Sequence, residues 1–210
     1  MNTRARAIKL PLWAGTPVEI EQGGWPVVES FLPAADNCEV GLTDLSHRPK
    51  AVVQGGAVAG LGAPKPGDAV WNGTRIVGRL KPRHAVVFDL GGPIQPNWEN
   101  AFYTDMTDAW VLLGLWGAGA VDVMQRLVTV DLKRSETGSP NFLATSSHGI
   151  RVQFVNLKTP SPGFLISCDR SHGQSLFDAC LRTGSQFNLK ITGVKAFDAW
   201  REGAGMARAH

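Results

Sequence analysis

Asp44, Ser46 and His47 lie close together in the sequence and are residue types found in catalytic groupings. A histidine can act as a general base, and a neighbouring aspartate can orient it. Side chains this close along one turn cannot easily converge as a triad. Aspartate and serine at such positions usually bond nearby backbone groups. We therefore predict turn and capping roles for these three residues.

Asp89 and Arg201 are the charged residues that best fit a small-ligand site. Asp89 follows an apolar run and precedes a glycine pair, so its carboxylate could take a proton, hold an amine, or close a turn. The planar guanidinium of Arg201 could clamp a carboxylate, or could pair with Asp198 or Glu202 along a helix. Asp89 is our candidate for catalysis and ligand binding, and Arg201 for ligand binding.

Four tryptophans, Trp98, Trp110, Trp116 and Trp200, could stack against a flat ligand. Large aromatic residues more often fill a core or an interface, so packing is the commoner role. Of the four, Trp110 is our candidate for the ligand-binding site.

Composition excludes several classes of function. The formal charge of +3 is spread over the chain without a block of like charge, which argues against nucleic-acid and membrane-surface binding but leaves an anionic small ligand open. Cys38, Cys168 and Cys180 share no metal-type spacing, so we expect reduced thiols, no disulfide framework and no metal site. Without an apolar leader or an apolar run of about 18 residues, we expect a soluble cytoplasmic protein.

Apolar spacing and the positions of glycine and proline predict the elements that must carry these side chains. We expect an extended arm over 1–24 with a strand near 17–21, then a short helix over 25–35. Residues 41–54 should form a hairpin of strand, tight turn and strand. Further strands are predicted over 67–80 with a turn at 71–74, and over 84–90, 104–116, 150–157, 164–168 and 189–191.

Helices are predicted over 117–128, 171–183 and 194–202, with Ser171 as a cap and Gly184 as a stop. Loops are expected over 91–100 and 133–140. This order of elements predicts an α+β fold in which helices cover one side of largely antiparallel sheets. We expect a single domain over 1–210.

The stretch Gly-Leu-Thr-Asp-Leu-Ser-His at 41–47 resembles the Gly-Leu-Phe-Asp-Val-Ser-His signature of the glycine-cleavage T protein family, the folate-binding aminomethyltransferases. Stretches 78–88, 108–127 and 163–205 resemble later parts of that family in the same order. The resemblance implies the family's folate-binding domain without its C-terminal barrel. Thr-Asp-Met-Thr-Asp-Ala-Trp and Ser-Cys-Asp-Arg-Ser-His make the chain most similar to the gamma subunits of heterotetrameric sarcosine oxidases.

The sequence departs from this family at the residues that the resemblance makes functional. The strand at 85–88 leads in family enzymes to Asn-Ala and a helix with a catalytic aspartate; here it leads to Asp89 and glycines, and Asp89 is the nearby substitute. The folate-holding glutamate of Gly-Phe-Glu-Ile is replaced by Leu165, which cannot bond the donors of a pterin. The family arginine is retained as Arg201.

The resemblance implies a role in tetrahydrofolate-linked one-carbon metabolism, for which two forms stay open. In the first, the chain is a non-catalytic subunit or degenerate relative that binds tetrahydrofolate weakly or not at all. Its partners would be flavin-containing amine oxidase subunits, or further copies of itself. In the second, it is a stand-alone tetrahydrofolate-dependent aminomethyltransferase that uses Asp89 and Arg201.

Overall fold

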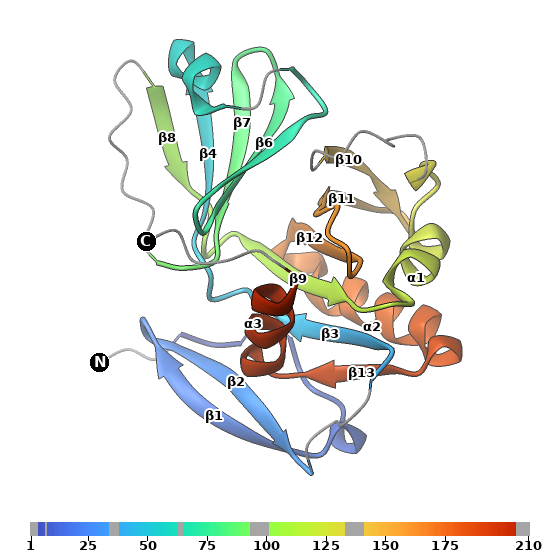
Figure 1. Ribbon diagram of the computed structural model, residues 1–210. Coiled ribbons are helices and arrows are strands. Elements are labelled where there is room, and N and C mark those ends of the chain that lie inside the picture. The colour runs from blue at the N-terminus through green and yellow to red at the C-terminus, as the bar shows by residue number, and fades with distance from the viewer. Residues whose placement is uncertain are drawn as a thin grey trace.

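Most of the residues that the computed structural model describes lie in two sheets, a separate hairpin and three α-helices (Figure 1). The described residues are 4–6, 8–33, 38–62, 65–92, 101–132 and 141–204. The α+β class predicted from the order of elements is confirmed, and the sheets are largely antiparallel.

The larger sheet has six strands in the order β10-β11-β12-β9-β3-β13. Its strands are β10 (Asn141–Ser147), β11 (Ile150–Asn156), β12 (Gly163–Asp169), β9 (Trp110–Trp116), β3 (Val40–Asp44) and β13 (Leu189–Thr192). Among the described strands of this sheet, only β13 and β3 pair in parallel. Helices α1 (Ala120–Leu127), α2 (Gly173–Gly184) and α3 (Val194–Gly203) pack around this sheet.

The smaller sheet has five antiparallel strands in the order β5-β6-β7-β4-β8. These strands are β5 (Ala69–Asn72), β6 (Arg75–Lys81), β7 (His84–Asp89), β4 (Lys50–Gly55) and β8 (Ala101–Asp105). The hairpin consists of β1 (Thr16–Gln22) and β2 (Trp25–Leu32). Short 3-10 helices lie at η1 (Leu12–Ala14), η2 (Gly56–Leu61), η4 (Arg170–His172) and η5 (Ser185–Phe187).

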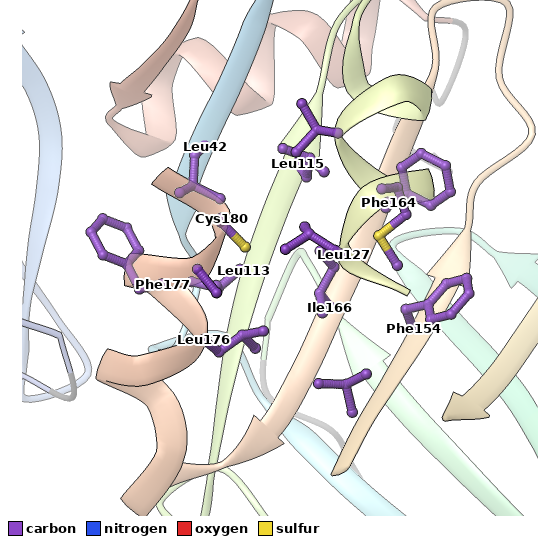
Figure 2. Packing of buried hydrophobic residues seen from close by; sticks show 14 of the residues in the cluster. Leu42, Leu113, Leu115, Leu127, Phe154, Phe164, Ile166, Leu176, Phe177 and Cys180 are labelled. Carbon is purple, nitrogen blue, oxygen red and sulfur yellow. The ribbon is translucent and has the colours of Figure 1, made fainter. Parts of the chain in front are cut away.

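The first core layer lies between the six-stranded sheet and helices α1 and α2. Side chains alternate along β9, so Val111, Leu113 and Leu115 share one face. Figure 2 shows Leu176 and Phe177 of α2 lying over this face. Burial of so many aliphatic and aromatic side chains is the main stabilising term for the layer, at about 25 cal/mol per Å² of apolar surface.

The second core layer lies between the opposite face of the same sheet and the five-stranded sheet. Leu112 of β9 and Leu165 of β12 belong to one buried cluster with Phe88 of β7 and Phe142 of β10. Phe197 of α3 joins this cluster, so α3 packs on the face opposite to α1 and α2. The prediction that all helices cover one side is therefore wrong, because α3 instead closes the space beside the second sheet.

The predicted helix over 25–35 is wrong, because this segment pairs with the preceding strand as β2. Gly23 and Gly24 both have positive φ, at 58° and 82°, which allows the tight turn that reverses the chain into a hairpin. Trp25 and Val27 are then buried in the second core layer, whereas Phe31, beyond a register shift at Val18 and Glu19, is buried in the first. Apolar spacings of one, three and four fit a helix in isolation, but tertiary pairing decided otherwise. Residues 34–37 lie outside the described residues.

The predicted hairpin over 41–54 is also wrong. β3 and β4 are strands, as expected, but β3 pairs with β9 and β13 while β4 pairs with β7 and β8. The connection at 45–49 therefore carries the chain from one sheet into the other. Residues 104–116 hold the end of β8, a turn and β9 in place of one continuous strand, and β10 had no counterpart among our predictions.

The remaining predicted elements are present, and their ends differ from the observed ends by at most a few residues. The turn at 71–74, the strands near 17–21, 84–90, 150–157, 164–168 and 189–191, and all three helices are present. Ser171 does not cap α2, since it lies in η4 and the helix has no side-chain cap. Gly184 ends α2, after which η5 continues the chain. Of the predicted loops, only Gly91 and Gly92 lie within the described residues.

We predict that Gly41→Ala will destabilise the fold. A Cβ atom at Gly41 would lie 2.2 Å from the indole of Trp116, its register partner on β9. Relieving that overlap should reduce the free energy of unfolding by about 1–3 kcal/mol. Gly56→Ala is the matched control, because its Cβ meets no atom within 4 Å and should change stability by less than about 0.5 kcal/mol. Equal urea midpoints for the two variants would contradict the packing described.

Candidate functional site

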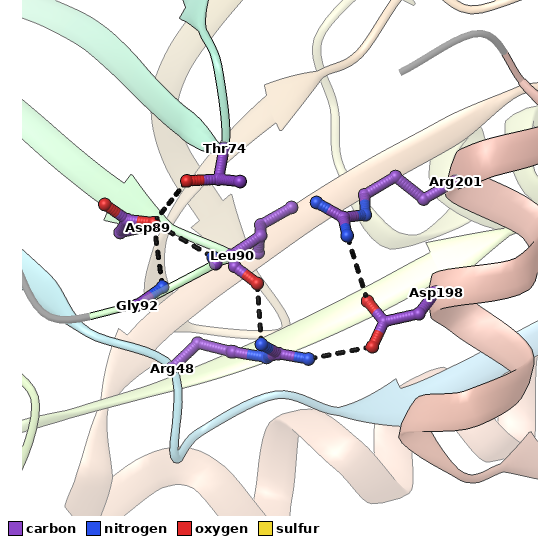
Figure 3. A network of polar contacts seen from close by, with 8 residues as sticks. Arg48, Thr74, Asp89, Leu90, Gly92, Asp198 and Arg201 are labelled. Atoms are coloured by element: carbon purple, nitrogen blue, oxygen red, sulfur yellow. Dashed lines mark hydrogen bonds and ion pairs between the residues drawn. The ribbon is translucent and has the colours of Figure 1, made fainter. Parts of the chain in front are cut away.

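Asp89 lies at the end of β7 with only 4% of its surface exposed, and its carboxylate is surrounded by donors. Its Oδ1 accepts hydrogen bonds from Thr74 Oγ1 at 2.9 Å and from the amides of Gly91 and Gly92 at 2.9 and 3.3 Å. Its Oδ2 pairs with Arg75 Nε at 3.3 Å. These contacts close the turn after β7 (Figure 3). A role as a proton acceptor would require the carboxylate to give up part of this network.

Arg201 on α3 is also buried, with 6% exposed, and it belongs to a chain of charged contacts. Its Nη2 lies 3.5 Å from Asp198 Oδ1, one turn earlier on the helix. Asp198 Oδ2 accepts a hydrogen bond from Arg48 at 2.9 Å, and Arg48 also donates to the carbonyl of Leu90 at 2.6 Å (Figure 3). These contacts hold α3 against the 45–49 connection and against the end of β7.

The charges in this series of contacts favour a structural role for Arg48 and Arg201. One carboxylate, that of Asp198, faces the two guanidinium groups of Arg48 and Arg201. Burial lowers the pKa of Arg48, the carboxylate of Asp198 opposes that change, and the charge of Arg201 adds to it. Arg201 Nε is buried without a hydrogen-bond partner among the described residues. A ligand acceptor would have to enter this buried region to reach Arg201 Nε.

Trp110, the third predicted ligand-binding residue, lies apart from Asp89 and Arg201. It begins β9 and lines a cleft of about 730 Å³ between the two sheets. Neither Asp89 nor Arg201 lines this cleft. The structure therefore brings Asp89 and Arg201 toward one region but does not join them with Trp110 in a single site.

Strand register explains how the cleft forms. On the five-stranded sheet, Thr104, Val52 and Val86 form one cross-strand row that faces it. On the six-stranded sheet, Gln153 and Ser167 are register partners that face it from the other side. Nearer to α3 the same two sheet faces are joined by the second core layer. The sheets therefore pack at one end and leave an opening at the other.

The cleft carries ionisable groups on both walls. Lys81 and His84 are register partners at the β6–β7 turn, and Arg151 lies on β11 across from them. Burial, followed by the charge of Lys81, lowers the pKa of His84, so the imidazole is neutral at pH 7. Burial, followed by the charge of Asp169, raises the pKa of Cys168 to about 12. The thiol is therefore a poor nucleophile.

The other tryptophans serve packing. Trp116 and Trp200 have ring centroids 5.8 Å apart, and Phe197 lies 5.5 Å from Trp200. The indole nitrogens donate to Thr43 Oγ1 and Ser161 Oγ, which satisfies them inside the fold. Trp98 lies outside the described residues.

Of Asp44, Ser46 and His47, Asp44 has the predicted turn role, whereas Ser46 bonds a distant strand and His47 Nε2 is buried without a hydrogen-bond partner among the described residues. Asp44 Oδ1 accepts a hydrogen bond from the amide of Ser46 at 2.9 Å, and Ser46 Oγ accepts one from the amide of Leu112 at 3.2 Å. Burial, with Arg48 and then other cationic charge nearby, lowers the pKa of His47 to about 3. The imidazole is thus neutral and makes no triad contact.

Lys50 is a residue that sequence reasoning missed. Its side chain is fully buried, and its Nζ donates to the carbonyls of Ser46 at 2.7 Å and Arg48 at 2.8 Å. Burial lowers its pKa to about 7, while Asp44 and more distant carboxylates oppose that change. The signal in the sequence was a lysine placed directly before the apolar run 51–53, a position that becomes buried once β4 is an inner strand.

Comparison with known proteins places the chain in a family. Residues 88–210, more than half of the sequence, match the family model described as the GCVT N-terminal domain. The chain belongs to the GCVT N-terminal domain family. A search of curated proteins finds no match. The resemblance noted in the sequence is thus confirmed at the level of the family.

Two solved structures show the same fold as this GCVT-family chain. A chain of the heterotetrameric sarcosine oxidase from Corynebacterium sp. U-96, in complex with pyrrole 2-carboxylate, has a TM-score of 0.58 and 18% identity over 71% of this chain and 85% of that one. The glycine cleavage system aminomethyltransferase T from Bartonella henselae has a TM-score of 0.70 and 16% identity over 92% of this chain. This chain spans 60% of the length of the aminomethyltransferase.

The side chain at the position where the resemblance puts a folate-holding glutamate does not fit a pterin. Leu165 is fully buried on β12 and belongs to an apolar cluster with Leu112, Val155 and Phe197. These side chains offer no acceptor to the ring donors of a pterin. The position is part of the core that joins the two sheets.

Two further findings concern the described residues alone. Among the described residues, no group of three or more histidine, cysteine, aspartate or glutamate side chains could hold a metal ion. In that same part of the chain, none of the helices is long and apolar enough to cross a membrane.

We predict that Asp89 contributes mainly to stability. Asp89→Ala removes the acceptor of the turn after β7 and should lower the free energy of unfolding by about 2–3 kcal/mol, because buried donors lose their partner. Asp89→Asn keeps an acceptor oxygen and should lose about 1 kcal/mol. Urea unfolding measures both, with Asp122→Ala on the exposed face of α1 as the control. Full stability in Asp89→Ala would contradict the structural role.

We predict that Lys50→Met loses stability and that the loss grows with pH. The folded-state pKa of Lys50, about 7, lies below its ordinary value of 10.5, so above pH 7 the unfolded chain binds a proton that the folded chain does not. The wild type therefore gains up to about 1.4 kcal/mol per pH unit from this residue between pH 7 and 10. Chemical unfolding at pH 6, 7.5 and 9 should show a widening gap between the two proteins. A constant gap would overturn the assignment.

Proposed function

We propose that this chain is a sarcosine oxidase gamma-like, non-catalytic subunit of a cytoplasmic amine oxidase complex in tetrahydrofolate-linked one-carbon metabolism. Its family membership and its fold support this proposal. The chain spans 85% of a chain of the heterotetrameric sarcosine oxidase but 60% of the aminomethyltransferase, so in extent it is closer to the subunit.

The observation that carries the proposal is the apolar core around Leu165. A folate-dependent transferase needs a polar group where the pterin donors lie, and here the position is filled by packed side chains. The retained charged residues support the same reading. Asp89 is engaged by Thr74 and backbone amides, and Arg201 is held to Asp198.

In this role the chain would help to form a cavity and would contribute no catalytic groups to it. The chain of contacts from Arg201 through Asp198 to Arg48 fixes α3 against the end of β7. A surface held in this way could form one wall of a cavity whose reactive groups belong to a flavin-containing partner. The alternative, a stand-alone aminomethyltransferase, would need Asp89 and Arg201 to be released for substrate.

We predict that the purified chain gives no binding heat with formyltetrahydrofolate in titration calorimetry, because the pterin position is apolar. A glycine-cleavage T protein measured under the same conditions is the positive control. Micromolar binding that is lost in Arg201→Ala and kept in Lys195→Ala would overturn the proposal and favour the transferase. Lys195 is a suitable control because it is exposed on the same helix, α3.

The same protein carrying an affinity tag should recover a flavin-containing chain in stoichiometric amount from the cells that express it naturally. Flavin absorbance and sedimentation of the recovered complex measure this. A protein that stays a monomer and carries no flavin through purification would contradict the subunit role.

A further inference from the structure

We propose that the cleft between the two sheets is a binding site for a small amphipathic organic anion, with an apolar body held between the sheets and an acidic group at the mouth. The cleft has a volume of about 730 Å³, within the range of small-molecule sites. It is separate from the residues that the family resemblance makes functional, because Asp89, Leu165 and Arg201 do not line it.

The walls supply an apolar surface. Val52 and Val86 are adjacent on the five-stranded sheet, and Met106 and Trp110 lie at the turn between β8 and β9. A flat or linear hydrocarbon body between these side chains would remove apolar surface from water on both of its sides.

The mouth supplies cationic groups from both walls. The cations are Lys81, which pairs with the neutral His84 across the β6–β7 turn, and Arg151, which shares the cleft-facing side of β11 with Gln153 because the two are two residues apart. Within the described ranges, Lys81 and Arg151 form no ion pair. Asp169 is the carboxylate among the lining residues, so the lining carries a net positive charge. An acidic group on the ligand would meet donors from both sheets.

The test uses two probes with the same ring system, anilinonaphthalene sulfonate and the uncharged phenylnaphthylamine. Both should bind one site per chain, detected by probe fluorescence. The double variant Lys81→Gln/Arg151→Gln should weaken the sulfonate about tenfold, which is the effect of losing about one charged hydrogen bond, and should change the uncharged probe less than about twofold. Lys195→Gln, on α3 outside the cleft, is the matched control and should change neither.

A second variant tests the apolar body. Ala144 is an exposed residue of the edge strand β10 and lines the cleft, so Ala144→Trp should fill the space and abolish binding of both probes while circular dichroism stays unchanged. Sulfonate binding that is unaffected by either cleft variant would overturn the site and assign the probe to another surface. This outcome is independent of the proposed function, which fails instead if formyltetrahydrofolate binds through Arg201.

Discussion

The hydrogen bonds of the Lys50 amine hold the connection that carries the chain from one sheet into the other, and both sheets depend on it. Nζ bridges the carbonyls of Ser46 and Arg48, while the amide of Leu45 continues the ladder to β9 through the carbonyl of Leu112. A neutral amine has two hydrogens and finds two acceptors here, which fits a pKa lowered by burial. The sharp change of direction between β3 and β4 therefore leaves these buried backbone carbonyls satisfied.

Arg48 extends this arrangement to the C-terminal helix. Its guanidinium joins the connection to Leu90 after β7 and to Asp198 on α3. The family resemblance would make Asp89 and Arg201 functional, and these residues lie on either side of this contact. Asp89 is bonded to Thr74 and Arg201 is paired with Asp198, so each belongs to its own local network. Removing one partner of a buried charged contact lowers the stability of the fold. These residues therefore have a structural role that does not require catalysis.

The space between the sheets is used in two different ways along its length. Near α3 it is filled by Leu165, Phe197 and their neighbours, and this packing positions the sheets. Farther from α3 the same faces diverge, and Trp110 lines a cleft with cationic groups at its mouth. Because sheets twist, two packed faces that are close at one end tend to separate at the other. The part of this space that is filled by packed side chains lies where the family resemblance would place a ligand, and the cleft lies beside it.

The sequence by itself determined the α+β class, most strand and helix positions and the family, because local periodicity and ordered motifs carry that information. It also identified Asp89 and Arg201 as candidates for a ligand site. Only the tertiary structure decided that 25–35 is a strand, that 41–54 crosses between sheets, and that Lys50 is buried. Strand pairing joins residues that are distant in sequence, and neither register nor burial is encoded in a single local stretch. The cleft was unpredictable for the same reason, since its walls come from strands that meet only after folding.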